Sequence, residues 1–395
     1  MDVYERALEL HKNARGKITV GCTVPLESRE DLTLAYTPGV AAPCRRIAAD
    51  PEAAYEYTAK SRLVAVVTDG SAVLGLGNIG GLAGLPVMEG KAVLFKRFGG
   101  VDAVPICLST QDTEEIIAAV RAIAPTFGGI NLEDISSPRC FEIEQRLEKE
   151  LDIPVFHDDQ HGTAIVVTAA LMNALRLAGK NMGDVRIVLS GPGAAGTAII
   201  KMLRHSGAKN ILAVDSHGIL YRGRQVGMDA HKNSLCEITN DEGKRGNLAD
   251  AMEGADVFIG VSAAGIVDED MIKSMAERPI VFAMANPTPE ISYDAALHAG
   301  AFIAGTGRSD RPNQINNLLA FPGVFRGALE AGARDINYAM KLAAARAIAE
   351  LIDDAHLAPD NIVPDPFDPR VSAHVAECVA EAAKVTGALR RGGKA

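Results

Sequence analysis

The chain has 395 residues, of which 48% are hydrophobic and 23% are charged, close to the usage of ordinary soluble globular proteins. This length predicts two or three domains and excludes a lone small module or a scaffold that depends on disulfides. Forty Lys and Arg residues against fifty Asp and Glu residues give a net charge of −10, which argues against general binding to nucleic acid or to anionic membranes.

The N-terminal segment, residues 1–17, alternates apolar and charged residues at helical spacing. It contains no apolar core, so we expect neither a signal peptide nor a membrane anchor there. The longest apolar stretch, 163–178, is interrupted by Asn173 and Arg176, which predicts a buried helix rather than a membrane span. The six cysteines are scattered without a C-x-x-C pair, so we expect mostly buried thiols and a cytoplasmic protein.

Short β-branched runs alternate with helical patterns from residue 63 onward. The runs at 63–69 and 101–108 predict strands, and Asp112 opens a pattern that resembles a capping box at the start of a helix. Ser137 and Pro138 predict the cap residue and the first-turn proline of another helix. Alternation of strands and helices is typical of parallel sheets, so we predict an α/β unit in this part of the chain.

A second series of strand-like runs begins near residue 185 and predicts a second α/β unit. After residue 330 the pattern is helical. The continuous helix at about 161–178 marks the boundary between the two units, so we predict domains over residues 1–160 and 161–395. The strands of the second unit are expected within 185–190, 211–216, 255–260, 279–286 and 301–305.

A glycine-rich turn between the first strand and the first helix of the second unit indicates nucleotide binding. Small residues there let the backbone approach a pyrophosphate at the positive N-terminus of a helix. The alternative is a tight turn that binds no ligand, and the presence of Asp215 after the next predicted strand argues against it. The run consists of Gly191, Pro192, Gly193, Ala194, Ala195 and Gly196.

Asp215 ends the next predicted strand, at about the spacing expected for the acidic residue that binds a ribose 2′-hydroxyl. This residue favours NAD. The neighbouring Ser216, His217, Arg222 and Arg224 would instead suit the 2′-phosphate of NADP. We therefore expect NAD or NADP, with a slight preference for NAD.

Two acidic pairs follow strand-like segments of the first unit. Glu133 and Asp134 form one pair, and Asp158 and Asp159 form the other. Such pairs are often solvated loop residues, but two of them at strand ends converge on the edge where open parallel sheets bind ligands. Their oxygens suit Mg²⁺ or Mn²⁺ better than zinc.

His157 and His161 flank the second acidic pair in the run HDDQH, which superficially resembles the zinc-binding helix of metallopeptidases. The second position of that motif would be an aspartate instead of the required glutamate, and Pro154 places the segment at a strand end. We expect both histidines to be packed or hydrogen-bonded near the domain junction.

Lys91 and Tyr36 are candidates for proton transfer. Lys91 precedes the apolar run VLFKRF, and a desolvated lysine or one near a metal has its pKa lowered towards that of a general base. Tyr36 lies before a proline-glycine turn and offers a phenol as a proton donor. A surface lysine and a buried, hydrogen-bonded tyrosine are the alternative interpretations.

Taken together, these residues resemble the malic enzymes, specifically the short bacterial and archaeal form. The similarity extends in the family's order from Tyr36 to Arg326. It is carried by the segments LAYTPGVA, VVTDGSAVLGLGNIG, EGKAVLFK, NLEDIS, FHDDQHGTA, FAMANPTPE and INNLLAFPGVF. The resemblance implies an α/β protein with a substrate and metal domain followed by a doubly wound, Rossmann-type NAD(P)-binding domain.

The resemblance also implies roles for single residues. Tyr36 would be the general acid and Lys91 the general base, with Asp158 supporting Lys91 electrostatically. Asn286 and Asn317 would contact the nicotinamide end of the cofactor and the substrate. The ligands of the divalent metal would be Glu133, Asp134 and Asp159.

The reaction implied is the oxidative decarboxylation of L-malate to pyruvate and CO₂ by a homodimer, with decarboxylation of oxaloacetate as a possible second activity. The chemistry fits these residue types, because the metal polarises the C2 oxygen while a base removes its proton. One departure concerns Ala72, which stands where larger members carry a carboxylate-binding arginine. The second carboxylate would then be bound by Ser71, by backbone N–H groups of residues 75–81, or by another subunit.

Three other functions compete with this interpretation. A zinc hydrolase built on HDDQH would leave the glycine-rich turn, Lys91 and Tyr36 unexplained. A catalytically silent dinucleotide sensor would need no acidic cluster beside Lys91. An amino-acid dehydrogenase has a similar two-domain layout but would need no divalent metal.

Overall fold

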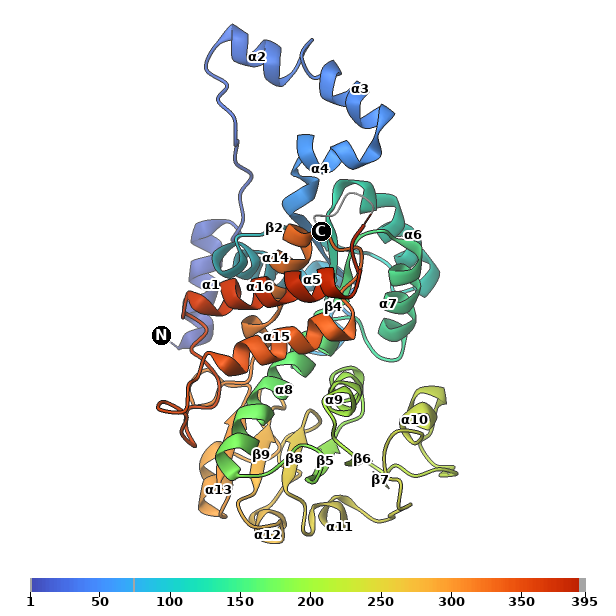
Figure 1. Ribbon diagram of the computed structural model, residues 1–395, viewed down its shortest axis with the longest axis vertical. Helices are drawn as coiled ribbons and strands as arrows, with labels where there is room; N and C mark the ends of the chain where they lie inside the picture. Colours follow the sequence, from blue (N-terminus) through green and yellow to red (C-terminus); the bar gives the residue numbers. More distant parts are fainter. Residues whose placement is uncertain (1, 74, 391–395) are drawn as a thin grey trace.

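The computed structural model describes residues 2–73 and 75–390. It contains two α/β units, each built on a largely parallel sheet, and a segment of helices near the N-terminus that projects from one end of the molecule (Figure 1). The outermost ends of the two predicted domains, residue 1 and residues 391–395, lie outside the described residues, as does Leu74.

The first sheet has four strands in the order β2-β1-β3-β4, and all of its pairs are parallel. Alternate residues of β1 face opposite cores: Ala65 and Val67 pack with α6 and α7, whereas Val64 and Val66 belong to the core that contains α8. Both faces are covered, which explains why β1 is apolar without a polar alternation. The elements are β1 Leu63–Thr68, β2 Asp102–Cys107, β3 Gly129–Leu132, β4 Val155–His157, α5 Gly80–Leu94, α6 Thr113–Ile123 and α7 Arg139–Glu150.

The second sheet has six strands in the order β10-β9-β8-β5-β6-β7. The five strands expected from the sequence are all present and parallel, and the α/β fold class is confirmed. The sequence did not indicate β7, which pairs antiparallel with β6, because two residues are too few to show a period. The strands are β5 Arg186–Ser190, β6 Asn210–Asp215, β7 Gly218–Ile219, β8 Val257–Gly260, β9 Ile280–Ala283 and β10 Ile303–Thr306.

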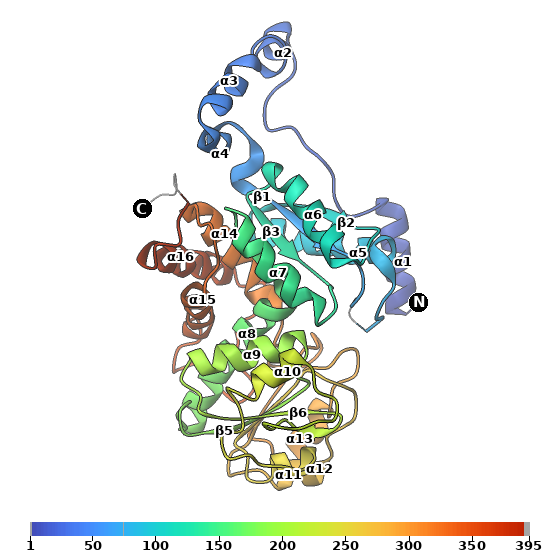
Figure 2. The same cartoon turned by 90° about the vertical axis from the view of Figure 1, so that its right-hand side faces the viewer.

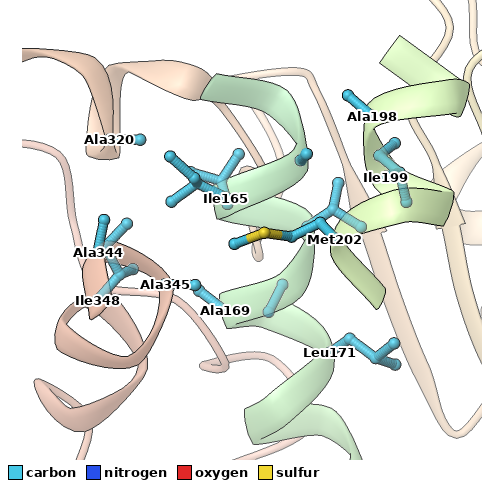
Figure 3. Close-up of a cluster of buried hydrophobic side chains, with 14 of the residues drawn as sticks. Ile165, Ala169, Leu171, Ala198, Ile199, Met202, Ala320, Ala344, Ala345 and Ile348 are labelled. Carbon is cyan, nitrogen blue, oxygen red and sulfur yellow. The ribbon is translucent and has the colours of Figure 1, made fainter. Parts of the chain in front are cut away.

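Helix α8, Asp158–Ala178, lies between the two units and joins their cores. It is the one helix of the described residues that is long and apolar enough to cross a membrane, but sixteen of its twenty-one residues are buried inside the protein. Figure 3 shows its apolar side chains, including Ile165 and Ala169, between helix α9 (Ala194–His205) on one side and α15 (Tyr338–Glu350) on the other. The expectation of a buried helix is confirmed.

The C-terminal helices return to the first unit, where α14 (Phe321–Ala331) and α16 (Arg370–Val385) lie beside its sheet (Figure 2). Phe95, which follows α5, packs edge-on against Phe321 and Phe325 of α14, with ring centroids 4.7 and 5.2 Å apart. Thus the last segment of the chain helps to build the core beneath the first sheet. The other α-helices that follow α9 are α10 Ala230–Leu235, α11 Leu248–Met252, α12 Glu269–Lys273 and α13 Tyr293–His298.

The two predicted helix starts differ in outcome. The side chain of Asp112 accepts hydrogen bonds from the backbone N–H groups of Glu114 and Glu115 and caps α6 as expected. The prediction for α7 was wrong by one position, because Pro138 itself is the N-cap and Ser137 makes no capping bond. Proline has no backbone N–H, and neither the N-cap nor the first helical residue needs one. The pattern Ser-Pro therefore cannot distinguish a helix whose N-cap is Ser137 from one whose N-cap is Pro138.

The segment that projects in Figures 1 and 2, residues 18–50, is called the arm here. It contains α2 (Arg29–Ala35) and α3 (Ala41–Ala49), between α1 (Val3–Ala14) and α4 (Ala54–Tyr57). All residues of the arm are described, and none of them is buried. Cys22 and Cys44 of the arm are exposed and only Cys140 and Cys236 are fully buried, so the expectation of mostly buried thiols was wrong.

Candidate active site

Three carboxylates converge at the carboxyl ends of β3 and β4. Glu133 and Asp134 directly follow β3, and Asp159 lies in the first turn of α8, which begins as soon as β4 ends. Each offers one oxygen within 4.8 Å of the others. Asp134 adopts a left-handed backbone conformation, with φ of 54°, and its N–H donates to the Asp159 carboxylate at 2.8 Å. Strained backbone of this kind is concentrated at functional sites.

The cluster has the properties of a site for a hard divalent cation. Burial, together with the charges of Asp159 and Glu133, raises the pKa of Asp134 to about 9. Among the described residues, Oδ2 of Asp134 is buried without a hydrogen-bond partner. The negative charges of the three carboxylates repel one another, and a cation such as Mg²⁺ or Mn²⁺ would relieve that repulsion. The unpaired oxygen of Asp134 would be available to bind it.

Binding of Mn²⁺ should therefore strengthen as the pH rises. Asp134 keeps its proton in the folded, metal-free protein up to about pH 9, whereas the ordinary pKa is 3.8. The free energy of unfolding of the metal-free protein should therefore fall as the pH rises between these two values, because the folded state holds a proton that the unfolded state has lost. A metal ion must displace the same proton to bind. We expect a fixed Mn²⁺ concentration to raise the melting temperature more at pH 8 than at pH 5.5. Equal shifts at the two pH values would contradict the protonation of this cluster.

Lys91 is the buried cation beside this cluster. Its ammonium lies 2.6 Å from Oδ2 of Asp158 and 2.9 Å from Oε1 of Glu133, and 4.2 Å from the ring centroid of Phe321. Burial alone would lower the pKa of Lys91, but the two carboxylates reverse this and raise it above the ordinary value. The sequence analysis expected a lowered pKa from desolvation or a nearby metal, and it did not include the two carboxylates that raise the pKa of Lys91 in the metal-free protein.

Glu144 of α7 was missed by the sequence analysis. It is buried and accepts hydrogen bonds from the backbone N–H of His157 at 2.7 Å and from the side chains of Gln160 and His161 at 3.0 and 3.1 Å. Burial would raise its pKa, but the charge and hydrogen bond of His161 lower it to about 2. Glu144 thus fastens the end of β4 and the first turn of α8. Nothing in the local sequence distinguishes it from its solvated neighbours in α7.

The two histidines of HDDQH do not belong to the carboxylate cluster in the described residues. His157 is fully buried, and His161 is bound to Glu144 and packs near Phe156. His161 is thus hydrogen-bonded and His157 is packed, which are the roles expected from the sequence. Neither ring nitrogen of His157 has a hydrogen-bond partner among the described residues, and its Nδ1 lies 3.9 Å from Oδ2 of Asp159. The zinc-hydrolase alternative would need both rings at one metal, whereas the ring of His161 is bound to Glu144.

The glycine-rich turn between β5 and α9 uses its three glycines differently. A Cβ on Gly191, whose φ is +94°, would meet the carbonyl oxygen of Val261 at 2.6 Å, and a Cβ on Gly196 would meet the carbonyl oxygen of Gly191 at 2.1 Å. A Cβ on Gly193, the N-cap of α9, would meet nothing within 4 Å. The outer glycines allow the tight turn and the close packing of helix and strand, while the middle one leaves open space for a ligand.

One cavity of about 880 Å³ joins the carboxylate cluster to this turn. Ala194 and Ala195 line it together with Lys91, and so do Asn286 and Asn317. The amide of Asn317 also donates a hydrogen bond to Asp158. The structure therefore brings the three clustered carboxylates, Lys91, the two asparagines and part of the glycine-rich turn to a single cavity, whereas Asp158, Asp215 and the glycines of the turn do not line it.

Tyr36 is the exception. It ends α2 in the arm, its exposed fraction is 67%, and none of the described residues that line the cavity comes from 18–71. The sequence could not predict this position, because the pattern LAYTPGVA contains no information on the direction in which the arm projects. Within one chain, the residue predicted to be the proton donor therefore lies outside the cavity.

Ala72 lines the cavity and its N–H donates to the carbonyl oxygen of Asp134 at 2.9 Å. The hydroxyl of Ser71, which the sequence analysis offered to the substrate, donates to Asp69 at 2.6 Å and accepts from the N–H of Ser136. Asp69 in turn pairs with Arg139 at 2.9 Å. Ser71 is thus occupied in fastening the loop before α5 to the loop after β3.

Asp215 lies at the end of β6, as expected for the ribose site. Its carboxylate accepts hydrogen bonds from Arg224 and from Lys232, the latter at 2.8 Å. Burial would raise its pKa, but these two cations lower it to about 2, so the carboxylate is ionised at neutral pH. Arg222 pairs with Glu237 at 3.2 Å, so two of the basic residues that would suit a 2′-phosphate are already paired.

Both units of the chain match known families. Residues 15–148 match the malic enzyme N-terminal domain, and residues 160–384 match the malic enzyme NAD binding domain. The chain belongs to the malic enzyme family. The resemblance inferred from the sequence motifs is therefore confirmed.

Individual malic enzymes are similar over nearly the whole chain. The bifunctional malic/malolactic enzyme of Bacillus subtilis is 56% identical over 390 residues, which cover 99% of this chain and 95% of that protein. The NAD-dependent malic enzyme of Geobacillus stearothermophilus is 54% identical, with coverage of 99% and 81%. The crystal structure of malic enzyme from Pyrococcus horikoshii superposes with a TM-score of 0.95 at 51% identity and covers 100% of this chain and 93% of that one. The matched malic enzymes include NAD-dependent and NADP-dependent members.

Proposed function

We propose that the protein catalyses the oxidative decarboxylation of L-malate to pyruvate and CO₂, with reduction of NAD⁺ or NADP⁺ and with Mg²⁺ or Mn²⁺ as the metal. The supporting observation is the single cavity that the carboxylate cluster, Lys91 and the glycine-rich turn share. A malate-sized molecule in it would lie between the metal ligands and the nicotinamide. Oxaloacetate, which has the same carboxylates and an oxygen at C2, is the proposed second substrate.

Lys91 is proposed as the base that takes the proton of the C2 hydroxyl. It must lose its own proton first, and the carboxylates of Asp158 and Glu133 now oppose that loss. When Glu133 serves as a metal ligand, Lys91 loses part of that electrostatic support and its pKa falls. Asp158 then remains to orient the amine and to hold the charge that it acquires.

The bound metal and nicotinamide supply polarisation of the C2 oxygen and acceptance of the hydride from C2. The bond between C3 and C4 then breaks, CO₂ leaves, and the electron pair remains at C3. Tyr36 is the proposed donor of the proton that C3 needs to become the methyl group of pyruvate. Asn286 and Asn317 line the cavity and are proposed to hold the substrate and the nicotinamide in register.

We propose NAD as the slightly preferred cofactor. The ionised carboxylate of Asp215 would accept from a ribose 2′-hydroxyl and repel a 2′-phosphate. Lys232, which shares that carboxylate, keeps the preference small because a phosphate would also attract it.

The two predicted domains, 1–160 and 161–395, remain our proposal for the domain division. The boundary falls within the first turn of α8, so the helix itself is the connection. We also propose a homodimer located in the cytoplasm. The location is argued from scattered cysteines that form no disulfide in the described residues.

The deciding experiment follows absorbance of reduced nicotinamide with purified protein, L-malate and Mn²⁺, in parallel with NAD⁺ and NADP⁺. We expect reduction that a chelator abolishes, with pyruvate formed in equal amount and a higher kcat/KM with NAD⁺. Decarboxylation of oxaloacetate is measured in the same preparation without cofactor. Folded protein that binds Mn²⁺ and reduces neither cofactor would overturn the proposal and favour the silent dinucleotide sensor.

A further inference from the structure

A second cavity, of about 390 Å³, lies on another side of the start of α8. It shares no lining residue with the active-site cavity: Asp159 and Thr163 of α8 line the active site, whereas Gln160 and His161 line the second cavity. Its other lining residues belong to α7, α9, α10, α15 and the loop before α15, so the cavity lies where the two units meet (Figure 2). It is called the α15 cavity here.

Four charged side chains line the α15 cavity without a partner of their own. They come from four different segments: Glu148 from α7, Lys201 from α9, Asp335 from the loop and Lys341 from α15. None of the four side chains forms an ion pair or a hydrogen bond with another residue of the described ranges, 2–73 and 75–390. Two positive and two negative charges thus line one cavity and remain separate.

Lys341 is the most deeply buried of the four, with an exposed fraction of 5%. Its ammonium lies 5.3 Å from the ring centroid of Tyr338 and 5.8 Å from that of Phe156, and neutral rings replace little of the hydration that a buried ammonium has lost. Burial lowers the pKa of Lys341, and the nearby carboxylates, chiefly that of Glu144, offset this only in part. Glu144 does not pair with it, because its oxygens already accept the hydrogen bonds described above.

Glu148 is in the opposite position. Burial, together with the charge of Glu144, raises its pKa to about 7, and the charge of Lys341 opposes this without a direct contact. The same cavity therefore contains an acid that lacks a cation and an amine that lacks an anion. Opposite charges that are held close together and kept from pairing reduce stability, and proteins retain such arrangements where a ligand completes them.

We infer that the α15 cavity is a binding site for a small zwitterion, specifically a free α-amino acid. Its carboxylate pairs with Lys341 and Lys201, and its ammonium pairs with Glu148 and Asp335. A molecule with one sign of charge would gain one pair of partners and meet repulsion from the other pair. The volume lies within the range of small-molecule sites, about 300–1,000 Å³. The inference is independent of the proposed function, because no residue of the α15 cavity lines the active site.

Binding is tested on the full chain without substrate, cofactor or turnover. The common L-amino acids are added singly at millimolar concentration, and the melting temperature is recorded. L-Glutamine is the first probe, because Gln145 and Gln160 line the cavity and can bind a side-chain amide. The ligand would connect α7, α9 and α15 and would bind only the folded chain, so at least one amino acid should raise the melting temperature. Isothermal titration with that amino acid should give one site per chain.

If no L-amino acid raises the melting temperature or binds in the titration, the inference is overturned. The proposed function is unaffected by that result, because malate oxidation is measured separately and uses none of these side chains.

Two analogues test whether both charges of the ligand are needed. For glutamine these are glutaramate, which lacks the ammonium group, and 4-aminobutanamide, which lacks the carboxylate. Each should bind about 10- to 100-fold more weakly than the amino acid, because hydrogen bonds to charged groups are lost. An analogue that binds as tightly as the amino acid would exclude a site for a zwitterion. The corresponding analogues are used if another amino acid binds best.

Substitutions locate the site. Lys341→Met keeps the length of the side chain and removes the buried ammonium, so the amino acid should bind about 10- to 100-fold more weakly. The ligand-free variant should nevertheless melt at a higher temperature than the parent, because a buried charge without a close partner is lost. Glu148→Gln should weaken binding in the same way, since it removes the charge that the ligand's ammonium needs.

Lys180→Met is the matched control. Lys180 does not line the α15 cavity, so its replacement should leave the affinity for the amino acid unchanged. Unchanged binding by the Lys341→Met protein would overturn the inference. A lower melting temperature of that variant without ligand would also overturn it, because the ammonium of Lys341 would then serve the fold alone.

Discussion

Replacing Lys91 with alanine should lower kcat for malate oxidation by about 10²- to 10⁴-fold, the usual contribution of a positioned general base. The metal ligands and the glycine-rich turn remain, so binding of reduced nicotinamide, measured by its fluorescence, should survive. The pair of measurements separates loss of chemistry from loss of the site. A Lys91→Ala protein with near-parent turnover would remove Lys91 from the role of base.

The same substitution should also weaken the fold. Lys91 is 7% exposed and its ammonium contacts Asp158 and Glu133, so its removal leaves two buried carboxylates without their cation. A buried charge without its partner destabilises a protein by about 3–5 kcal/mol. Urea unfolding without metal should report this loss, and Mn²⁺ should restore part of it. The control is Lys180→Ala, which removes a lysine paired with Asp256 at 2.7 Å outside the residues that line the cavity.

Replacing Asp159 with asparagine should weaken Mn²⁺ binding by at least about 100-fold, because one of three anionic ligands is lost and even supporting contacts around a metal are worth 10- to 100-fold. The amide oxygen of asparagine can still accept from the N–H of Asp134, so the turn after β3 should keep its shape. Malate oxidation at low Mn²⁺ should fall with the affinity. Isothermal titration with Mn²⁺ measures the affinity directly.

The metal-free Asp159→Asn protein should melt at a higher temperature than the parent at pH 8. The charge of Asp159 is, after burial, the largest cause of the raised pKa of Asp134, so its removal relieves repulsion among buried carboxylates. Asp152→Asn, at an exposed position seven residues earlier, should change neither affinity nor melting temperature. An Asp159→Asn protein that binds Mn²⁺ as tightly as the parent would exclude this residue as a ligand.

Local sequence patterns predicted those strands, turns and site residues whose structure depends mainly on their neighbours in the chain. The strands β5, β6 and β8 to β10 are continuous apolar runs, and the glycines of the β5 turn have steric reasons that any sequence with this turn must meet. Glu133, Asp134, Asp158 and Asp159 could be expected together because the ends of parallel strands share one edge of a sheet.

The features that the sequence did not predict depend on contacts between residues that are distant in the chain. Glu144 acts across thirteen residues on His157 and has no signature of its own. The pKa of Lys91 is decided by Asp158 and Glu133, which its own segment does not contain. Tyr36 was recognised from its motif, yet its position depends on where a whole arm projects. Motifs identify residue types, whereas the charge balance around a side chain and the direction of a projecting segment are properties of the whole fold.

The three carboxylates proposed as metal ligands all stand at one edge of the first sheet. Glu133 and Asp134 follow β3, and Asp159 lies two residues after β4, in the first turn of α8. The rest of α8 packs on α9 and α15, so its first turn is the point where the first sheet meets the helix that joins the two cores. A cation held by all three carboxylates would therefore stabilise this junction, and by the same free energy local opening of the first turn of α8 would weaken the metal.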